Sequence, residues 1–104
     1  KLKFKTMYKI RGRITEIKNE EIESKAGETF EKLLVTICEL DSDFEHHHQF
    51  EIFGKENIKI HKDNIVEDSL VNIEFYIKSR EWNDRWFNTL MIKNISIENK
   101  EDIF

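Results

Sequence analysis

Residues 70–88 read LVNIEFYIKSREWNDRWFN, and apolar and polar side chains alternate along their first half. This period of two is typical of a β-strand, whose successive side chains point to opposite faces. One face carries the apolar residues that we expect in the core: Val71, Ile73, Phe75 and Ile77. The other face carries Tyr76, Lys78, Arg80 and Trp82. The pattern predicts a long strand from Leu70 to Trp82 and, after a turn, a strand from Trp86 to Ile97.

The predicted turn concentrates aromatic rings and guanidinium groups. They belong to Arg80, Trp82, Arg85, Trp86 and Phe87. Aromatic rings stack on the flat faces of nucleic-acid bases and Arg attracts phosphates, so such a surface suits a single strand bound without regard to its sequence. The alternative is that the two Trp side chains only stabilise a hairpin through cross-strand packing.

Length and composition favour one folded, soluble domain. The chain has 104 residues, of which 37% are charged and 38% apolar. This length suffices for a single compact core, and the apolar content argues against a disordered chain. Cys38 is the one cysteine, so it forms no internal disulfide, and neither a long apolar run nor a signal peptide is found. We expect a reducing, cytoplasmic compartment and no membrane association.

The net charge of −4 opposes nucleic-acid binding, but the charge is unevenly distributed. Residues 1–13 contain six basic side chains and no acid, at positions Lys1, Lys3, Lys5, Lys9, Arg11 and Arg13. All six positions are odd, so in a strand they share one face. We predict that Lys9, Arg11 and Arg13 contact phosphates. The alternative is a solvated outer face whose lysines guard a sheet edge.

The remaining segments complete an order of strand, strand, strand, short helix, strand and strand. The first strand is expected at Met7–Lys18 with a bend at Gly12, the second at Thr29–Leu40, and the third ends at Phe53; residues 55–65 suggest a short helix or turns. This is the order of the five-stranded Greek-key barrel called the OB-fold, which is all-β apart from one short helix. Residues 1–97 would form this domain and residues 98–104 a short acidic tail. Phe53 is expected to face outward.

Four short elements, in order, resemble the bacterial and phage single-stranded DNA-binding protein family. They are Gly12-Arg13-Ile14-Thr15, Phe53-Gly54-Lys55, Ser69-x-Val71-x-Ile73 and Arg80-x-Trp82. Through Arg80-Glu81-Trp82 and Phe87-Asn88, the chain is also similar to short OB-fold proteins without an assigned function. The resemblance implies that Phe53 and Trp82 stack on bases.

Two departures from the family pattern qualify this resemblance. His47 stands where the family often has a stacking Trp, and the expected loop from Glu16 to Glu28 is acidic. Because one subunit offers a small footprint, we expect a homo-oligomer, a dimer or a tetramer, that multiplies contacts on one strand. The resemblance implies a bacterial cell or phage-infected host. The last residues, Asp102-Ile103-Phe104, resemble the acidic tip through which that family docks replication and repair proteins, although a frayed or packed C-terminus remains the alternative.

Other chemistries find less support in the sequence. His46-His47-His48 suggests metal binding, but with only Glu45 and the distant His61 as further candidates no complete ligand set can be assembled, so we expect no metal. Cys38 lies in an apolar run and is interpreted as a core residue. No catalytic constellation or phosphate-binding loop is found, so we expect neither an enzyme nor a cofactor.

The sequence therefore predicts a sequence-nonspecific single-stranded DNA-binding protein that protects unpaired DNA during replication, recombination or repair. Tyr76, Lys78 and the aromatic hairpin would supply the binding surface together with Phe53. The alternatives are an OB-fold adaptor that binds a protein and a protein that binds single-stranded RNA.

Overall fold

The computed structural model describes residues 6–40 and 42–98, which form five strands and one short helix. The strands are β1 (Tyr8–Glu23), β2 (Thr29–Glu39), β3 (His47–Phe53), β4 (Leu70–Trp82) and β5 (Arg85–Ile97). The helix α1 (Lys55–His61) continues into a 3-10 turn (Lys62–Asn64) and joins β3 to β4. These bounds confirm the predicted order of elements.

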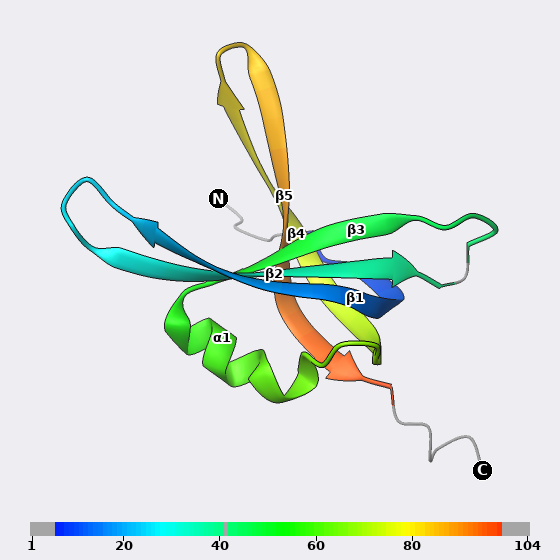
Figure 1. Ribbon diagram of the computed structural model, residues 1–104. Helices are drawn as coiled ribbons and strands as arrows, with labels where there is room; N and C mark the ends of the chain where they lie inside the picture. The colour runs from blue at the N-terminus through cyan, green and yellow to red at the C-terminus, as the bar shows by residue number, and fades with distance from the viewer. Residues whose placement is uncertain (1–5, 41, 99–104) are drawn as a thin grey trace.

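The strands form a closed barrel in the order β1-β2-β3-β5-β4, with β1 pairing β4 to complete the circle (Figure 1). Neighbouring strands run antiparallel except β3 and β5, which run parallel. This is the Greek-key connectivity of an OB-fold barrel, so the predicted fold class is confirmed.

Alternation along the strands builds the core, as predicted. Ile14, Val35, Ile37, Phe50 and Val71 are completely buried. Phe50 and Phe75 meet edge to face inside the barrel, with ring centroids 4.9 Å apart. Since every second residue of a strand points inward, the residues between them face outward.

Gly12 is the point at which β1 changes partners. It pairs with Val71 of β4 and with Glu39 of β2, and β1 follows β4 before it and β2 after it. A Cβ at this position would lie only 2.7 Å from the backbone oxygen of Cys38. The glycine therefore permits the close approach that lets β1 curl around the barrel, as the sequence indicated.

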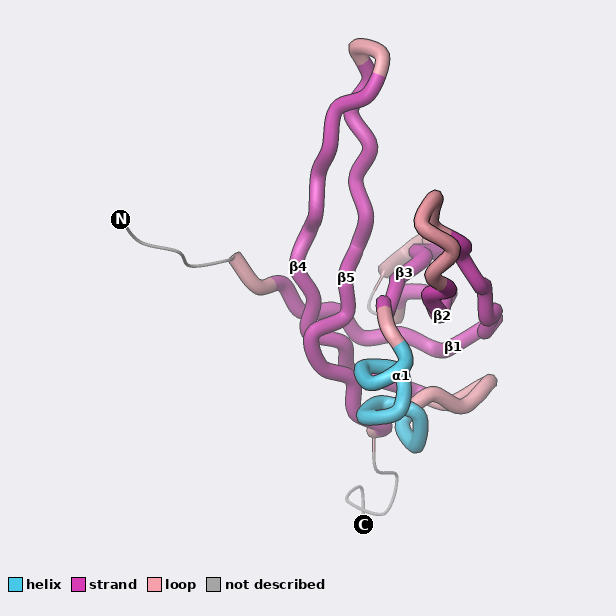
Figure 2. The backbone as a smooth tube through the Cα atoms, turned by 90° about the vertical axis from the view of Figure 1, so that its left-hand side faces the viewer, coloured by secondary structure: helices cyan, strands magenta, loops and turns pink. Residues whose placement is uncertain are grey.

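Three expectations about local structure were wrong. β1 continues to Glu23, so most of the acidic segment expected as a loop is one arm of the β1–β2 hairpin. Ile77 is 44% exposed rather than buried, because β4 and β5 extend beyond the barrel as a second hairpin (Figure 2). Cys38 is only partly buried and does not belong to the core.

A two-residue turn, Asn83-Asp84, ends the β4–β5 hairpin. Both residues have positive φ, 51° and 63°. Two successive left-handed residues are typical of the type I′ turn, whose twist matches that of the flanking strands, and Asn and Asp tolerate this conformation well. The turn therefore places Trp82 directly opposite Arg85.

The C-terminal end of β5 is tied to the barrel. The Glu98 amide donates to the Leu70 carbonyl at 2.8 Å, so the first residue of the predicted tail is held in place. The predicted docking tip Asp102-Ile103-Phe104 lies outside the described residues, as do Lys1, Lys3 and Lys5. Within residues 6–40 and 42–98, no helix is long and apolar enough to cross a membrane.

Candidate nucleic-acid interface

The β4–β5 hairpin has two faces of different composition, and its register assigns each residue to one of them. Trp82 pairs with Arg85, Arg80 with Phe87, and Lys78 with Thr89. Directly paired residues of an antiparallel ladder point to the same side, so these cationic and aromatic groups share one face. We call the surface formed by Tyr76, Lys78, Arg80, Trp82, Arg85 and Phe87 the hairpin binding face.

Trp86 does not belong to this face. It pairs with Glu81, one position out of step with Trp82, and therefore points to the back of the hairpin with Ile77 and Leu90. The expectation that both Trp side chains share one surface is thus wrong. The cause is the even turn of two residues, which puts Trp82 opposite Arg85 and not opposite Trp86.

A groove of about 1170 Å³ joins the hairpin binding face to the barrel. Residues from both hairpins, β3 and α1 line it. Five of the predicted site residues meet there: Phe53, Tyr76, Lys78, Arg80 and Phe87. Trp82 and Arg85 form the next pair along the same face, beyond the end of the groove. The described structure therefore brings seven of the predicted binding residues onto one connected surface.

Phe53 lies at the start of this surface, at the end of β3. Its side chain is 41% exposed, and its ring packs against Phe30 of β2 with centroids 5.7 Å apart. Gly54 follows with φ 96° and starts α1, so the chain turns away and leaves one side of Phe53 open. Phe53 therefore faces outward as predicted, with a ring neighbour that holds its orientation.

The groove is positively charged although the chain is acidic. Among the described residues, four basic side chains line it, Lys32, Lys78, Arg80 and Lys93, against one carboxylate, Glu51. The Lys32 ammonium lies 3.4 Å from Glu51 and 3.9 Å from Glu20, which offsets part of its charge. The sequence-wide charge is therefore a poor guide to the potential at this surface.

His61 of α1 lines the same groove, where its surroundings favour the neutral form. Burial, followed by the positive charge of Lys93, lowers the pKa of His61 below its usual value of 6.5. A neutral imidazole offers a partly apolar ring beside the cations, and it gains a positive charge only in acid.

The basic face of β1 lies elsewhere on the barrel. Lys9 and Arg11 border a shallow depression with Asn72, Asn94 and Ser96, and the groove lining includes none of the three predicted β1 cations. Arg11 donates two hydrogen bonds to Glu98, 2.7 Å and 2.6 Å long, and these bonds lower the pKa of Glu98. Arg13 donates to the Asp68 carbonyl at 3.3 Å. Arg11 and Arg13 thus have partners within the protein.

Sequence reasoning missed Phe30, which packs against Phe53, and the groove residues Lys32, His61 and Lys93. The signal for the first two was the alternation in β2, where Leu33, Val35 and Ile37 are buried and the even positions between them face outward. Lys93 sits at an irregularity of register between β4 and β5, which alternation along the sequence does not reveal.

Residues 9–96 match a family model described as a domain of unknown function, DUF3127. The chain belongs to this family. No curated protein matches the chain. The family assignment agrees with the expected likeness to short OB-fold proteins without an assigned function.

Several solved structures, including that of a single-stranded DNA-binding protein, have the same fold. The mitochondrial single-stranded DNA-binding protein Rim1 of S. cerevisiae superposes with a TM-score of 0.67 at 17% identity, covering 90% of this chain and 96% of that one. The dimeric N-terminal domain of PriB from Thermoanaerobacter tencongensis gives 0.56 at 18% identity, with 90% and 97% covered. An SSB domain from Synechococcus sp. gives 0.60 at 7% identity, with 92% and 99% covered. The likeness to the single-stranded DNA-binding family is thus confirmed for the fold.

Proposed function

We propose that the protein binds single-stranded DNA without sequence specificity, along the groove and the hairpin binding face. The observation that carries this proposal is the convergence of exposed aromatic rings and an excess of basic side chains on one surface of an acidic chain. Base stacking needs the rings, and phosphate binding needs the cations.

The surface suggests a path for the strand. One base would stack on Phe53, others on Tyr76 and Phe87 in the groove, and another on Trp82 near the hairpin tip. Lys78 and Arg80 lie between Tyr76 and Trp82 on β4, so they would meet phosphates between the bases stacked at either end. None of these contacts reads a base edge with a fixed donor and acceptor pattern, which supports binding that tolerates any sequence.

The role that follows is protection of unpaired DNA during replication, recombination or repair. The fold shared with single-stranded DNA-binding proteins supports it, and so does an open groove lined by aromatic rings and cations. We propose that the protein acts by binding and performs no reaction of its own.

The two Trp residues, on opposite faces of one hairpin, make the decisive experiment possible. A Trp86→Phe variant keeps Trp82 as its one Trp, and a Trp82→Phe variant keeps Trp86. Titration with oligo-dT should quench fluorescence strongly in the first variant and weakly in the second. Equal quenching in both would remove the hairpin binding face from the proposal, and absence of binding at low salt would favour the protein-binding adaptor.

Competition in the same assay separates the nucleic-acid classes. Oligo-dT, the matched oligo-U and a duplex of equal length are added to the preformed fluorescent complex. We expect the single-stranded DNA to compete best and the duplex least, because a duplex hides the base faces. Stronger competition by oligo-U would assign the protein to single-stranded RNA instead.

We also propose a homo-oligomer, a dimer or a tetramer, with the back of the hairpin as its contact. Trp86 is 66% exposed there, and the exposed Ile77 and its partner Leu90 lie further along the same face, beyond the Ser79–Asn88 pair. Large apolar groups exposed on one face are typical of protein interfaces. Light scattering after size exclusion should show an oligomer for the native chain and a smaller species for Ile77→Asp.

A further inference from the structure

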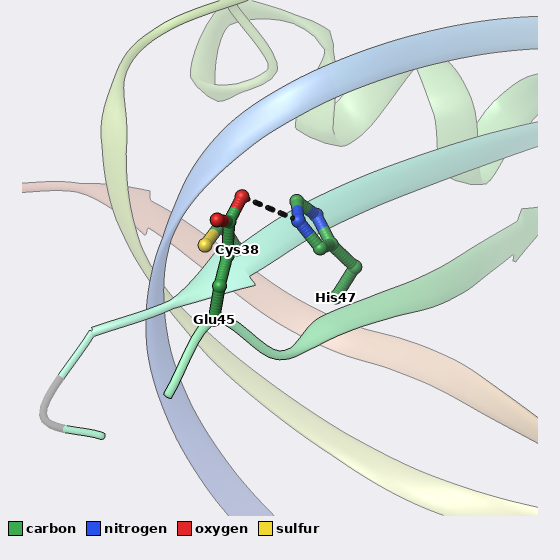
Figure 3. A group of neighbouring side chains, drawn as sticks. All are labelled: Cys38, Glu45 and His47. Carbon is green, nitrogen blue, oxygen red and sulfur yellow. Dashed lines mark hydrogen bonds and ion pairs between the residues drawn. The ribbon is translucent and has the colours of Figure 1, made fainter. Parts of the chain in front are cut away.

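Cys38, Glu45 and His47 converge where β2 ends and β3 begins (Figure 3). Their potential ligand atoms, a thiol sulfur, a carboxylate oxygen and an imidazole nitrogen, all lie within 4.8 Å of one another. The sequence did not bring them together, because Cys38 looked like a core residue. Instead, Cys38 lies on the outer side of β2, in register with His47.

Backbone pairing fixes the positions from which these side chains project. Cys38 and His47 are directly opposite in the β2–β3 ladder, and the Glu39 amide donates to the His46 carbonyl at 2.8 Å. The His47 imidazole Nε2 already lies 2.9 Å from a Glu45 carboxylate oxygen. Two of the three groups are therefore in contact, and the third is held beside them by the sheet.

We propose that Cys38, Glu45 and His47 bind a divalent transition-metal ion of the Zn²⁺ class. Thiolate, imidazole and carboxylate are the three donor types that Zn²⁺ takes in proteins, whereas Mg²⁺ and Ca²⁺ prefer oxygen alone. Ligand atoms around tetrahedral Zn²⁺ lie roughly 3.5 Å apart, so small side-chain rotations would close the site. Binding releases the thiol proton, and thiolate and carboxylate then neutralise both charges of the ion. A water molecule would complete the coordination.

The neighbouring polar side chains have other partners and do not belong to the proposed ligand set. His48 is bonded to Glu39 at 2.8 Å, and the His46 ring packs edge to face on Phe44 with centroids 6.4 Å apart. Arg13 lies next to Cys38 in register but donates to the Asp68 carbonyl, on the β4 side of β1. The site therefore depends on one particular histidine of the run, which gives a matched control in His46.

The test uses the reduced full chain without an affinity tag or chelator. Zn²⁺ is titrated calorimetrically and Co²⁺ by absorption, because a thiolate ligand gives Co²⁺ a charge-transfer band in the near ultraviolet. We expect one ion per chain, the band abolished in Cys38→Ser, and affinity lowered more than about tenfold in His47→Ala, since even residues behind metal ligands contribute that much. His46→Ala should bind as the native chain does.

Several results would overturn the proposal. They are absence of binding, a Co²⁺ spectrum without the thiolate band, and an equal loss in His46→Ala and His47→Ala, which would show adventitious binding to the histidine run. If the Cys38 variant does not fold, alkylation of the native chain decides the matter. Zn²⁺ must slow the reaction of Cys38 with iodoacetamide, and an unchanged rate would refute the site.

Discussion

Trp82→Ala should weaken binding of oligo-dT about 30-fold. The side chain is 63% exposed on the hairpin binding face. A fully exposed Trp presents up to about 250 Å², so roughly 160 Å² remains accessible, and a stacked base covers about half of that. At about 25 cal/mol per Å², the lost contact is worth about 2 kcal/mol, which lies within the usual range for one stacked base. That free energy corresponds to about a 30-fold change in Kd.

The assay is fluorescence anisotropy with a labelled oligo-dT at fixed salt, and Trp86→Ala serves as its matched control. Trp86 is equally exposed, at 66%, on the same hairpin but on its back face. With an oligo-dT short enough to contact only one subunit, we expect its removal to leave the affinity unchanged, and Trp82→Phe to retain most of the binding. Circular dichroism melts confirm that each variant is folded. Equal losses in the two alanine variants would indicate damage to the hairpin, and an unchanged Kd in a folded Trp82→Ala protein would refute stacking on Trp82.

Four further outcomes follow from the geometry. Gly12→Ala should lower stability by about 1–3 kcal/mol in urea unfolding, because its Cβ would lie 2.7 Å from a backbone oxygen of β2; an unchanged midpoint would contradict the close packing. Arg80→Ala should reduce the slope of log Kd against log salt by about 0.7 for a single strand, and an unaltered slope would place the guanidinium away from the phosphates. Because the pKa of His61 is lowered, protonation below it adds a groove cation, so DNA affinity should rise as pH falls, less so in His61→Asn. The pKa of Glu98 is also lowered, through Arg11, so the stability from this pair is present near neutral pH and lost as pH falls through the folded-state pKa; the difference in Tm between the native chain and Glu98→Gln should therefore vanish in acid.

Strand order and barrel class could be predicted from this sequence because alternation is local information. In β4, the buried Val71, Ile73 and Phe75 follow the predicted parity, and the half-buried Tyr76 and the exposed Lys78 lie on the opposite face, as predicted. The pattern wrongly predicted burial of Ile77. The apolar–polar alternation continues to this residue, but the barrel has already ended. A period of two shows which residues share a face but not whether another element covers that face.

The residues that make up the site were harder to predict from the sequence, because they depend on the register between strands far apart in the chain. The opposite placement of Trp82 and Trp86 depends on the length of one turn, and the groove cations Lys32 and Lys93 come from strands far apart in sequence. The cluster of Cys38 with His47 likewise exists only because β2 and β3 pair in that register. Pairing offsets of this kind are set by the closed barrel as a whole and not by any short segment.

The distribution of charge would allow this acidic chain to bind the anionic ligand proposed for it. Salt screens the repulsion between DNA and the net charge of −4 beyond about 8–10 Å. The groove cations, in contrast, would act at contact distance, where screening is weak. Glu51 beside Lys32 and Glu98 beside Arg11 compensate particular cations, while Lys78 and Arg80 lie on an exposed face between stacking rings. We therefore expect stacking to contribute a larger share of affinity than in a basic protein, with counterion release confined to a few phosphates. The aromatic rings would then determine how tightly the strand is held, and the cations where its backbone runs.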